Sequence, residues 1–409
     1  GCACIKPKPY FLEVAAREHG VDLGRSFTVG DHPHDAELAN SVGATGVYVL
    51  TGHGLRHLGE LGAGFVVLAS LADARQVFLA PGDESADDAI ERAAGLLRRG
   101  GVVAFPTETV YGLGASALDP RAVARVFEIK RRPAFDPLIV HIDRLSWVER
   151  LTRVVPPSAA RLMRRFWPGP LTLVLPKSPL IPDLVTAGMP TVALRMPAHE
   201  QALSLLRTCG IPICAPSANP FGYVSPTCAE HVVEQLGDAV DQVLDGGPCA
   251  LGIESTIVDL SGSVARVLRH GAIAYEAIGA ALGERVEVGA ASSTVAAPGS
   301  LPRHYSPRVR LQLFAGEIPP PPTRSSGLLL QRPREVPSGY AVRELLSRDG
   351  NPAEVAYHLF ATLRRLDKAP LDLVVAEIAP EQGLGRAIND RLRRASFRGE
   401  QGDGRPDAR

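Results

Sequence analysis

The sequence predicts an α/β protein whose largest domain is built on a mixed, twisted sheet. In residues 88–279, seven short apolar runs typical of buried strands are interspersed with five helical patterns. The two do not alternate strictly, as a doubly wound parallel sheet would require. The chain has 409 residues, of which 45% are hydrophobic and 22% charged, so it can build several domains with sizeable cores.

The first region, residues 1–80, alternates helix and strand, and a small acidic run after it reads as a linker. We expect helices at residues 9–19 and 35–42, and strands at residues 26–29 and 46–50. In the central domain, residues 88–279, we expect helices at 89–99, 121–129, 158–166, 200–209 and 229–236. Its strands are expected at 102–105, 138–141, 171–175, 191–195, 211–215, 256–260 and 265–268.

The last two regions are a linker and a smaller domain. Residues 280–309 contain a run rich in Ala, Ser and Pro, which indicates an irregular connection. Residues 310–396 resume a βαβ-like rhythm, with strands expected at 327–330 and 371–377 and helices at 353–367 and 385–395.

Net charge, apolar runs and cysteine positions bear on nucleic-acid binding, membrane association and the redox compartment of the protein. The formal net charge is zero, which argues against strong non-specific nucleic-acid binding by the whole molecule and leaves a local basic patch open. No apolar run is long enough to span a bilayer, so no membrane partner is expected. Four of the six cysteines are scattered singly through the middle of the chain, and we therefore expect a reduced, cytoplasmic protein.

The stretch GVVAFPTETVYGLG, residues 101–114, is a buried strand that gives way to a polar turn. The strand stops at Pro106, and Thr107, Glu108 and Thr109 follow. We expect Gly112 and Gly114 to allow close approach of the backbone to a ligand. Ligands of open α/β sheets bind at strand ends, so this turn is a candidate pocket wall.

A basic connection follows the next helix. Pro133 disfavours helical geometry at Arg132, so we expect Lys130, Arg131 and Arg132 on an extended path, with Lys130 and Arg132 on one side. Such a pair suits a polyphosphate, although a solvated basic turn explains the same residues. His141 on the following strand is either a ligand contact or a satisfied core residue.

Two further strand ends carry polar groups. Thr191 and Arg195 share one face of a strand, and a buried Arg needs an anion, either a ligand or an internal salt bridge. Ser217 and Asn219 offer a hydroxyl and an amide, or form an ordinary turn. The sequence contains no Walker loop, no GxGxxG opening a helix, no HExxH and no GxSxG, so a nucleotide would be held by another scheme.

The segments PTETVYGLG, KRRP, PLIVHI, WPGPLTLVL, TVALRMPAH, APSAN and GIESTIVDL occur in the order found in the YrdC-like threonylcarbamoyl-AMP synthases. The resemblance covers residues 88–279, and PGSLPRHYSP and GLGRAINDRLRRAS resemble the linker and the small Rossmann-like C-terminal domain of the longer, two-domain form. It implies an enzyme, a nucleotidyltransferase, that makes L-threonylcarbamoyl-adenylate and pyrophosphate from ATP, L-threonine and bicarbonate or CO2. It also implies a downstream tRNA threonylcarbamoyl-transferase machinery as partner. We expect Mg²⁺ with the ATP, as in other phosphate-transfer sites, and weak RNA binding stays open.

The same resemblance implies residue roles. The catalytic tetrad would be Lys130, Arg132, Ser217 and Asn219, and the threonine site Thr109, His141, Arg195 and Ser255. The ATP site would be Arg132, Asp136, Thr191, Ala215, Ser217, Ser225, Arg269 and Tyr305, with Tyr305 as a lid over the site.

Residues 1–65 resemble the C-terminal part of a HAD-type phosphatase, which implies a partial Rossmannoid segment. Lys6 matches that family's phosphate-binding lysine, Asp31 and Asp35 its Mg²⁺ motif, and Cys2 and Cys4 half of its zinc site. The DxD nucleophile motif is absent from the chain, so we predict no phosphatase activity from it. The segment is therefore the tail of a longer fused protein or a remnant.

Two alternatives to the synthase hypothesis remain open at this stage. One is an RNA-binding or regulatory module that uses the same basic concavity, which zero net charge and few aromatic residues disfavour. The other is a bifunctional fusion with an upstream HAD phosphatase.

Overall fold

The computed structural model describes residues 6, 8–62, 65–68, 86–289 and 304–397, and the chain divides into two compact units, Gly1–Asp88 and Ala89–Arg409. Cys2 and Cys4 lie outside the described residues. Among the described residues, no helix has both the length and the apolar character needed to cross a bilayer.

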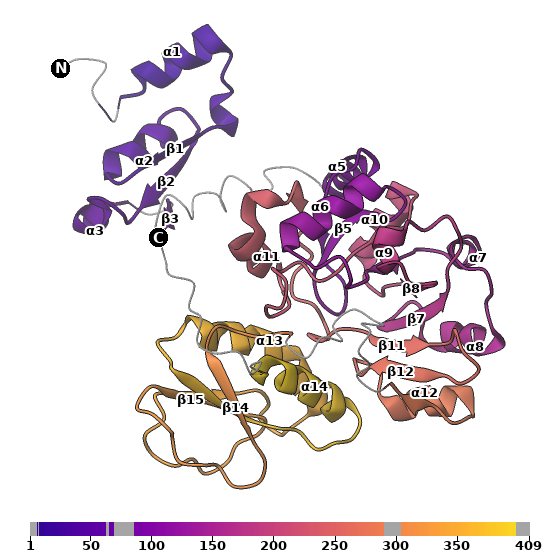
Figure 1. Cartoon of the computed structure of the whole chain (residues 1–409). Helices are drawn as coiled ribbons and strands as arrows, with labels where there is room; N and C mark the ends of the chain where they lie inside the picture. Colours follow the sequence, from indigo (N-terminus) through magenta and orange to yellow (C-terminus); the bar gives the residue numbers. More distant parts are fainter. Residues whose placement is uncertain (1–5, 7, 63–64, 69–85, 290–303, 398–409) are drawn as a thin grey trace. The chain divides into compact units, whose positions relative to one another are not determined.

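The first unit is a small α/β layer (Figure 1). Its three parallel strands lie in the order β1 (Phe27–Gly30), β2 (Thr45–Val49) and β3 (Val66–Leu68). Its helices are α1 (Tyr10–His19), α2 (Pro33–Asn40) and α3 (Gly54–His57). The expected elements are present within two residues at each end, and β3 and α3 were not foreseen.

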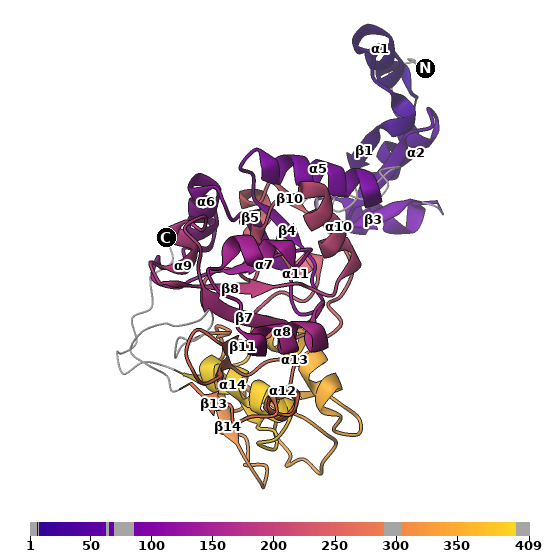
Figure 2. The same ribbon diagram turned by 90° about the vertical axis from the view of Figure 1, so that its right-hand side faces the viewer.

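The second unit contains a ten-stranded sheet with the strand order β10-β4-β5-β9-β6-β8-β7-β11-β12-β13. The strands are β4 (Val103–Phe105), β5 (Gly112–Ser116), β6 (Ile139–His141), β7 (Leu171–Pro176), β8 (Thr191–Arg195), β9 (Ile213–Cys214), β10 (Gln242–Val243), β11 (Thr256–Asp259), β12 (Arg266–Arg269) and β13 (Glu287–Val288). Parallel and antiparallel pairs alternate irregularly, which confirms the predicted mixed sheet. Figure 2 shows β8, β7 and β11 following one another across it.

Helices cover this sheet and supply its core. They are α5 (Ala86–Arg98), α6 (Pro120–Lys130), α7 (Ser146–Leu151), α8 (Pro157–Phe166), α9 (Asp183–Thr186), α10 (Glu200–Cys209), α11 (Ala229–Leu236) and α12 (Tyr275–Leu282). The five expected helices are all present, whereas α7, α9 and α12 were missed. Local chemistry sets their starts: the Asp119 carboxylate accepts the Arg121 N–H at 2.9 Å at the beginning of α6, and Pro120 occupies the first turn.

The two glycines expected to allow close approach to a ligand have different surroundings in the structure. Gly112 and Gly114 are not turn residues but belong to β5, which pairs with β4 and β9. A Cβ on Gly114 would come within 2.7 Å of the Phe105 ring and 2.9 Å of Ile213, so this glycine permits close packing inside the sheet. Gly112 alone lines the pocket described below.

The C-terminal domain is a second, fully parallel sheet in the order β14-β17-β15-β16. Its strands are β14 (Arg310–Phe314), β15 (Ser326–Leu330), β16 (Val342–Leu345) and β17 (Leu373–Glu377), and its helices are α13 (Pro352–Lys368) and α14 (Leu384–Ser396). The apolar core under α13 and α14 also contains Val110, Val224 and Ile253 from the larger domain and Tyr305 from the linker. The two domains of this unit therefore share a core.

Candidate functional site

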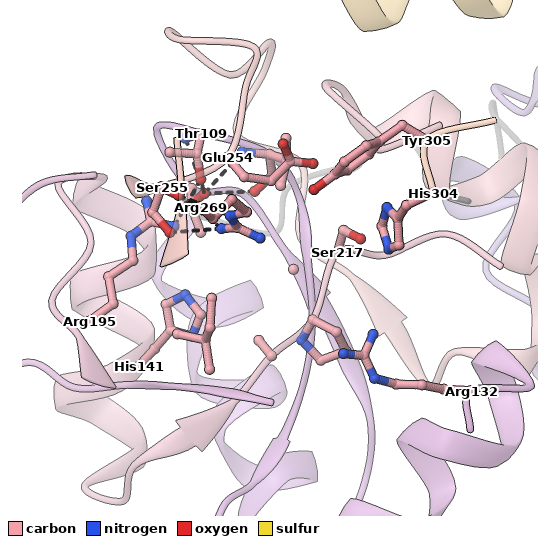
Figure 3. A pocket seen from close by; sticks show the side chains of 16 residues that line it. Thr109, Arg132, His141, Arg195, Ser217, Glu254, Ser255, Arg269, His304 and Tyr305 are labelled. Atoms are coloured by element: carbon pink, nitrogen blue, oxygen red, sulfur yellow. Dashed lines mark hydrogen bonds between the residues drawn. The ribbon is translucent and has the colours of Figure 1, made fainter. Parts of the chain in front are cut away.

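A pocket with about 540 Å³ of empty space, a volume that includes open solvent, lies at the strand ends of the large sheet. Eight separate chain segments contribute its sixteen lining residues: Thr107, Thr109, Val110, Gly112, Arg132, Ile139, His141, Arg195, Ala215, Pro216, Ser217, Glu254, Ser255, Arg269, His304 and Tyr305. Three of them are arginines. In Figure 3, Arg195 and His141 lie on one side of the cavity, and Arg132, Ser217 and His304 lie on the other.

The polar turn after β4 folds back on itself. The Thr107 hydroxyl donates to the Val110 carbonyl at 2.6 Å and accepts the Thr109 and Val110 N–H groups at 3.2 Å each. The Thr109 hydroxyl lies 2.8 Å from that of Thr107 and accepts a hydrogen bond from Arg195 Nη1 at 2.9 Å. The turn thus presents Thr109 to the pocket in a fixed orientation.

The sequence left open whether Arg195 pairs with a ligand or forms an internal salt bridge, and the structure shows a salt bridge with Glu108. Its Nη2 lies 2.7 Å from Oε2 of Glu108, and both side chains are almost fully buried. Sequence reasoning gave Glu108 no role. Arg195 still lines the pocket, so the ion pair fixes a guanidinium at the cavity wall.

His141 and Arg195 are neighbours because the parallel strands β6 and β8 end side by side, and their register pairs the two residues. Burial, with Arg195 adding to the effect, lowers the pKa of His141 to about 3. The imidazole is therefore neutral at physiological pH.

The basic connection differs from the expected extended path. Helix α6 continues through Lys130, and Arg131 then reverses the chain in a left-handed conformation with φ 51°. Lys130 does not line the pocket: its ammonium donates to the carbonyls of Ser217 and Asn219 and thereby holds the loop that carries Ser217. Burial lowers its pKa well below the usual value. Arg131 is exposed.

Arg132 reaches the pocket from a buried ion pair. Its Nη2 lies 2.9 Å from Asp136 Oδ2, and its guanidinium also donates to the carbonyls of Asp136 at 3.0 Å and Pro137 at 2.7 Å. Burial lowers the pKa of Arg132, and the Asp136 charge opposes that effect. Asp136 itself lies behind the wall, fully buried, and does not line the cavity.

The third arginine, Arg269, ends β12 and is directed at Ser255. It donates to the Ser255 carbonyl at 3.0 and 3.1 Å and to the Ser255 hydroxyl at 3.1 Å. That hydroxyl also lies 2.8 Å from the hydroxyl of Thr172. Ser255 is thus held between a cation and a neighbouring strand at the edge of the pocket.

The linker residues His304 and Tyr305 close the pocket on the side of Arg132 (Figure 3). Tyr305 has φ 58°, and its ring stacks on Phe360 of α13 with centroids 5.5 Å apart. Within the described residues, the Tyr305 hydroxyl and His304 Nδ1 are buried without a hydrogen-bond partner. Burial, with four nearby cations adding to the effect, holds the pKa of His304 well below its usual value.

The structure brings nine of the expected site residues to the cavity and leaves five behind it. Those at the cavity are Thr109, Arg132, His141, Arg195, Ala215, Ser217, Ser255, Arg269 and Tyr305, and those outside its lining are Lys130, Asp136, Thr191, Asn219 and Ser225. The Asn219 amide donates to the carbonyls of Pro220 and Tyr223, and the Ser225 hydroxyl donates to Glu254 at 2.5 Å. Sequence reasoning missed Glu254 and His304, although both adjoin residues that it selected.

The first unit holds the other candidate residues. Asp31 accepts the His53 N–H at 2.8 Å, and Asp35 lies 2.6 Å from Lys6 Nζ. Among the residues that the structure describes, no three His, Cys, Asp or Glu side chains are grouped so that they could hold a metal ion.

The mixed sheet, the arginine-lined pocket at its strand ends and the appended parallel domain define a two-domain α/β enzyme of the YrdC-like class. A family model described as "Telomere recombination" (Sua5/YciO/YrdC) matches residues 95–271, and one for the threonylcarbamoyl-AMP synthase C-terminal domain matches residues 273–396. The chain belongs to the threonylcarbamoyl-AMP synthase family. A HAD-hydrolase-like model matches residues 3–74, in agreement with the resemblance of that segment.

Individual relatives agree with the family. The chain is 43% identical to the threonylcarbamoyl-AMP synthase of Pyrococcus abyssi, over 75% of this chain and 94% of the relative. It is 41% identical to that of Bacillus subtilis, over 76% and 93%. The solved P. abyssi Sua5 complexed with L-threonine is 40% identical, with a TM-score of 0.69 over 75% of this chain and 94% of that one. These matches confirm that the chain is a transferase of the nucleotidyltransferase type, as the motifs predict.

Proposed function

We propose that this enzyme joins L-threonine, CO2 derived from bicarbonate, and ATP to form L-threonylcarbamoyl-adenylate and pyrophosphate. One observation carries the proposal: a single pocket holds Arg195 with Thr109 on one side and Arg132 with Ser217 on the other. Two anionic substrates can therefore bind close together. The name of the relatives and the threonine bound to P. abyssi Sua5 support the choice of substrates.

The proposed chemistry explains why cations line the cavity. The threonine amine attacks CO2, a C–N bond forms, and the nitrogen releases a proton to give a carbamate. A carbamate oxygen then attacks the α-phosphorus of ATP, and the bond to the bridging oxygen breaks to release pyrophosphate. Carbamate and triphosphate are both anions, so fixed guanidinium groups that reduce their repulsion would supply most of the catalysis together with positioning.

Arg195 is the residue proposed to hold the threonine carboxylate, with Thr109 and Ser255 beside it. Arg132 and Arg269 are proposed to face the phosphates, and Ser217 to contact the nucleotide. His141 is neutral because of its lowered pKa, so we assign it a hydrogen-bonding role rather than a charged one. Lys130 and Asn219 act on this site through the loop that they hold.

Mg²⁺ is proposed to enter as part of the substrate Mg·ATP. The carboxylate that lines the pocket, Glu254, is already engaged by Ser225 at 2.5 Å and Arg391 at 2.8 Å. Since both oxygens of this carboxylate already accept hydrogen bonds from protein groups, the triphosphate itself and water would hold the ion.

The product is proposed to supply a tRNA threonylcarbamoyl-transferase machinery that makes N6-threonylcarbamoyladenosine. The adenylate is an activated acyl donor, so a transferase that places the threonylcarbamoyl group on a nucleoside amine must consume it. An RNA-binding module that lacks catalysis is the alternative outcome of the tests.

Pyrophosphate release from ATP tests the proposal. We expect release to require both L-threonine and bicarbonate. Arg132→Gln should reduce it by about 100-fold or more, because a fixed cation facing the developing charge is lost. Arg131→Gln is the matched control, because Arg131 is adjacent in sequence and its side chain is exposed. Its backbone is left-handed in the wild-type protein as well, so the substitution replaces one non-glycine side chain with another. Release without threonine dependence, or equal rates for the two variants, would contradict the assignment.

The HAD-like segment is proposed to have no phosphatase activity of its own. Lys6 and Asp35 form an ion pair, and the carboxylate nucleophile of an aspartyl-phosphate mechanism is absent from the sequence. Turnover of p-nitrophenyl phosphate should be negligible. Rapid turnover that Asp31→Asn abolishes would show the opposite.

A further inference from the structure

Arg391, on helix α14 of the C-terminal domain, contacts the wall of the synthase pocket. Its side chain is fully buried. Nε donates to Oε2 of Glu254 at 2.8 Å, and Nη1 donates to the His270 carbonyl at 2.6 Å. Nη1 also lies 2.9 Å from the carboxylate of Asp390. Glu254 lines the pocket, so Arg391 touches the cavity wall from behind.

The Glu254 carboxylate is held at both oxygens. Oε1 accepts from the Ser225 hydroxyl at 2.5 Å, and Oε2 accepts from Arg391. An uncompensated carboxylate at this position would repel any anion that enters the pocket, and burial of the Glu254 side chain would strengthen the repulsion. Arg391 therefore compensates the negative charge of a wall that must accept anions.

Arg391 also contacts a second part of the wall, the ring of Tyr305. Its guanidinium carbon lies 5.1 Å from the centroid of the Tyr305 ring, a cation–π distance. The ring of Tyr305 stacks on Phe360 of α13 as well. Within the described part of the chain, Arg391 Nη2 has no hydrogen-bond partner, so hydrogen bonding alone does not account for the placement of this group.

We propose that Arg391 is a positioning residue of the synthase pocket, which compensates Glu254 and holds the Tyr305 ring, so that the C-terminal domain completes the pocket. The inference rests on the proposed function in one respect: that the pocket binds anionic substrates. If the C-terminal domain only packed against the synthase domain, it would need no buried cation at the pocket wall.

Other ion pairs between the same two domains provide matched controls. Arg386, also on α14, lies 3.2 Å from Glu276 of α12, and Lys368 of α13 lies 2.7 Å from Glu234 of α11. Both pairs are substantially exposed, and neither lines the pocket. Arg386→Met thus removes an interdomain arginine from the same helix without uncovering a charge at the cavity.

The first test compares variants in steady-state pyrophosphate release and in binding of α,β-methylene-ATP, which cannot be cleaved at the α–β bridge. Arg391→Met should lower kcat/KM and weaken nucleotide binding by about 30-fold or more, because Glu254 is left buried and unpaired. Arg391→Lys should stay closer to wild type, and Arg386→Met should match wild type.

The second test separates charge compensation from simple stabilisation. In the double variant Glu254→Gln/Arg391→Met the uncovered charge is gone, so nucleotide binding should recover at least about tenfold relative to Arg391→Met. A merely structural role for Arg391 predicts no recovery, because the double variant has lost one more native contact.

Two results would overturn the inference. One is equal binding and activity for Arg391→Met and Arg386→Met, and the other is a double variant no better than Arg391→Met when all variants are folded by circular dichroism. Failure of the proposed function has a different signature, since the wild-type enzyme itself would then show no release dependent on threonine and bicarbonate. The binding measurements still test Arg391 in that case.

Discussion

The buried pair between Glu108 and Arg195 makes the sharpest stability prediction. Its charged atoms are 2.7 Å apart, and the two side chains are 8% and 4% exposed. Glu108→Gln removes the charge but keeps the shape and one acceptor oxygen. Arg195 would then have neutral acceptors alone: this amide oxygen, the Thr109 hydroxyl at 2.9 Å and the Gly169 carbonyl at 3.4 Å. Removing one partner of a buried pair costs about 3–5 kcal/mol, and the retained acceptor places this variant at about 3 kcal/mol.

Urea unfolding followed by tryptophan fluorescence measures the loss of unfolding free energy in the synthase domain. The chain has two tryptophans, Trp147 and Trp167, and both lie in that domain. Glu287→Gln is the control. Glu287 lies 2.9 Å from Arg266 in an exposed pair, for which a change of about 0–1 kcal/mol is expected. L-Threonine should stabilise the Glu108→Gln variant more than wild type, since its carboxylate would compensate the unpaired Arg195. A loss no larger than that of the control would refute the reasoning.

Three further substitutions test other parts of the account. His141→Gln should make the unfolding free energy less sensitive to acid. The pKa of His141 is about 3 in the folded state and about 6.5 in the unfolded state, so wild type loses about 2 kcal/mol of stability between pH 8 and pH 5. Urea unfolding of both proteins at the two pH values measures the difference. Lys130→Met leaves two buried carbonyls without their donor and should lower the melting temperature and kcat together; unchanged values would count against its anchoring role. Gly114→Ala places a methyl group against Phe105 and should cost about 1–3 kcal/mol of unfolding free energy in the same assay, whereas a neutral result would contradict the packing argument.

Much of the fold could be predicted because its strands are short apolar runs bounded by Pro, Gly and polar residues. All seven strands expected in residues 88–279 exist, within two residues at each end. Two strands of this range, β5 and the two-residue β10, were not expected. The β5 segment reads GLGAS, which carries neither β-branched residues nor alternation. It is a strand because β4 and β9 pair with it on either side, and that pairing is a tertiary event.

The site could be predicted only in part for the same reason. The motifs located nine cavity residues, but a residue's partner depends on contacts far along the chain. Glu108 and Arg195 meet across the turn after β4, and Arg391 and Glu254 are separated by 137 residues. The path after Lys130 was misjudged because Arg131 adopts the left-handed conformation that a glycine usually takes at a helix end.

The most direct test of the central claim follows the carbon atom of bicarbonate. Purified enzyme is incubated with Mg·ATP, L-threonine and carbon-13-labelled bicarbonate, and the products are separated and analysed by mass spectrometry. The account predicts threonylcarbamoyl-AMP that carries the label, together with an equal amount of pyrophosphate, from wild-type enzyme and far less from Arg132→Gln. Pyrophosphate formed without a labelled adenylate, or no turnover by the folded enzyme, would contradict it.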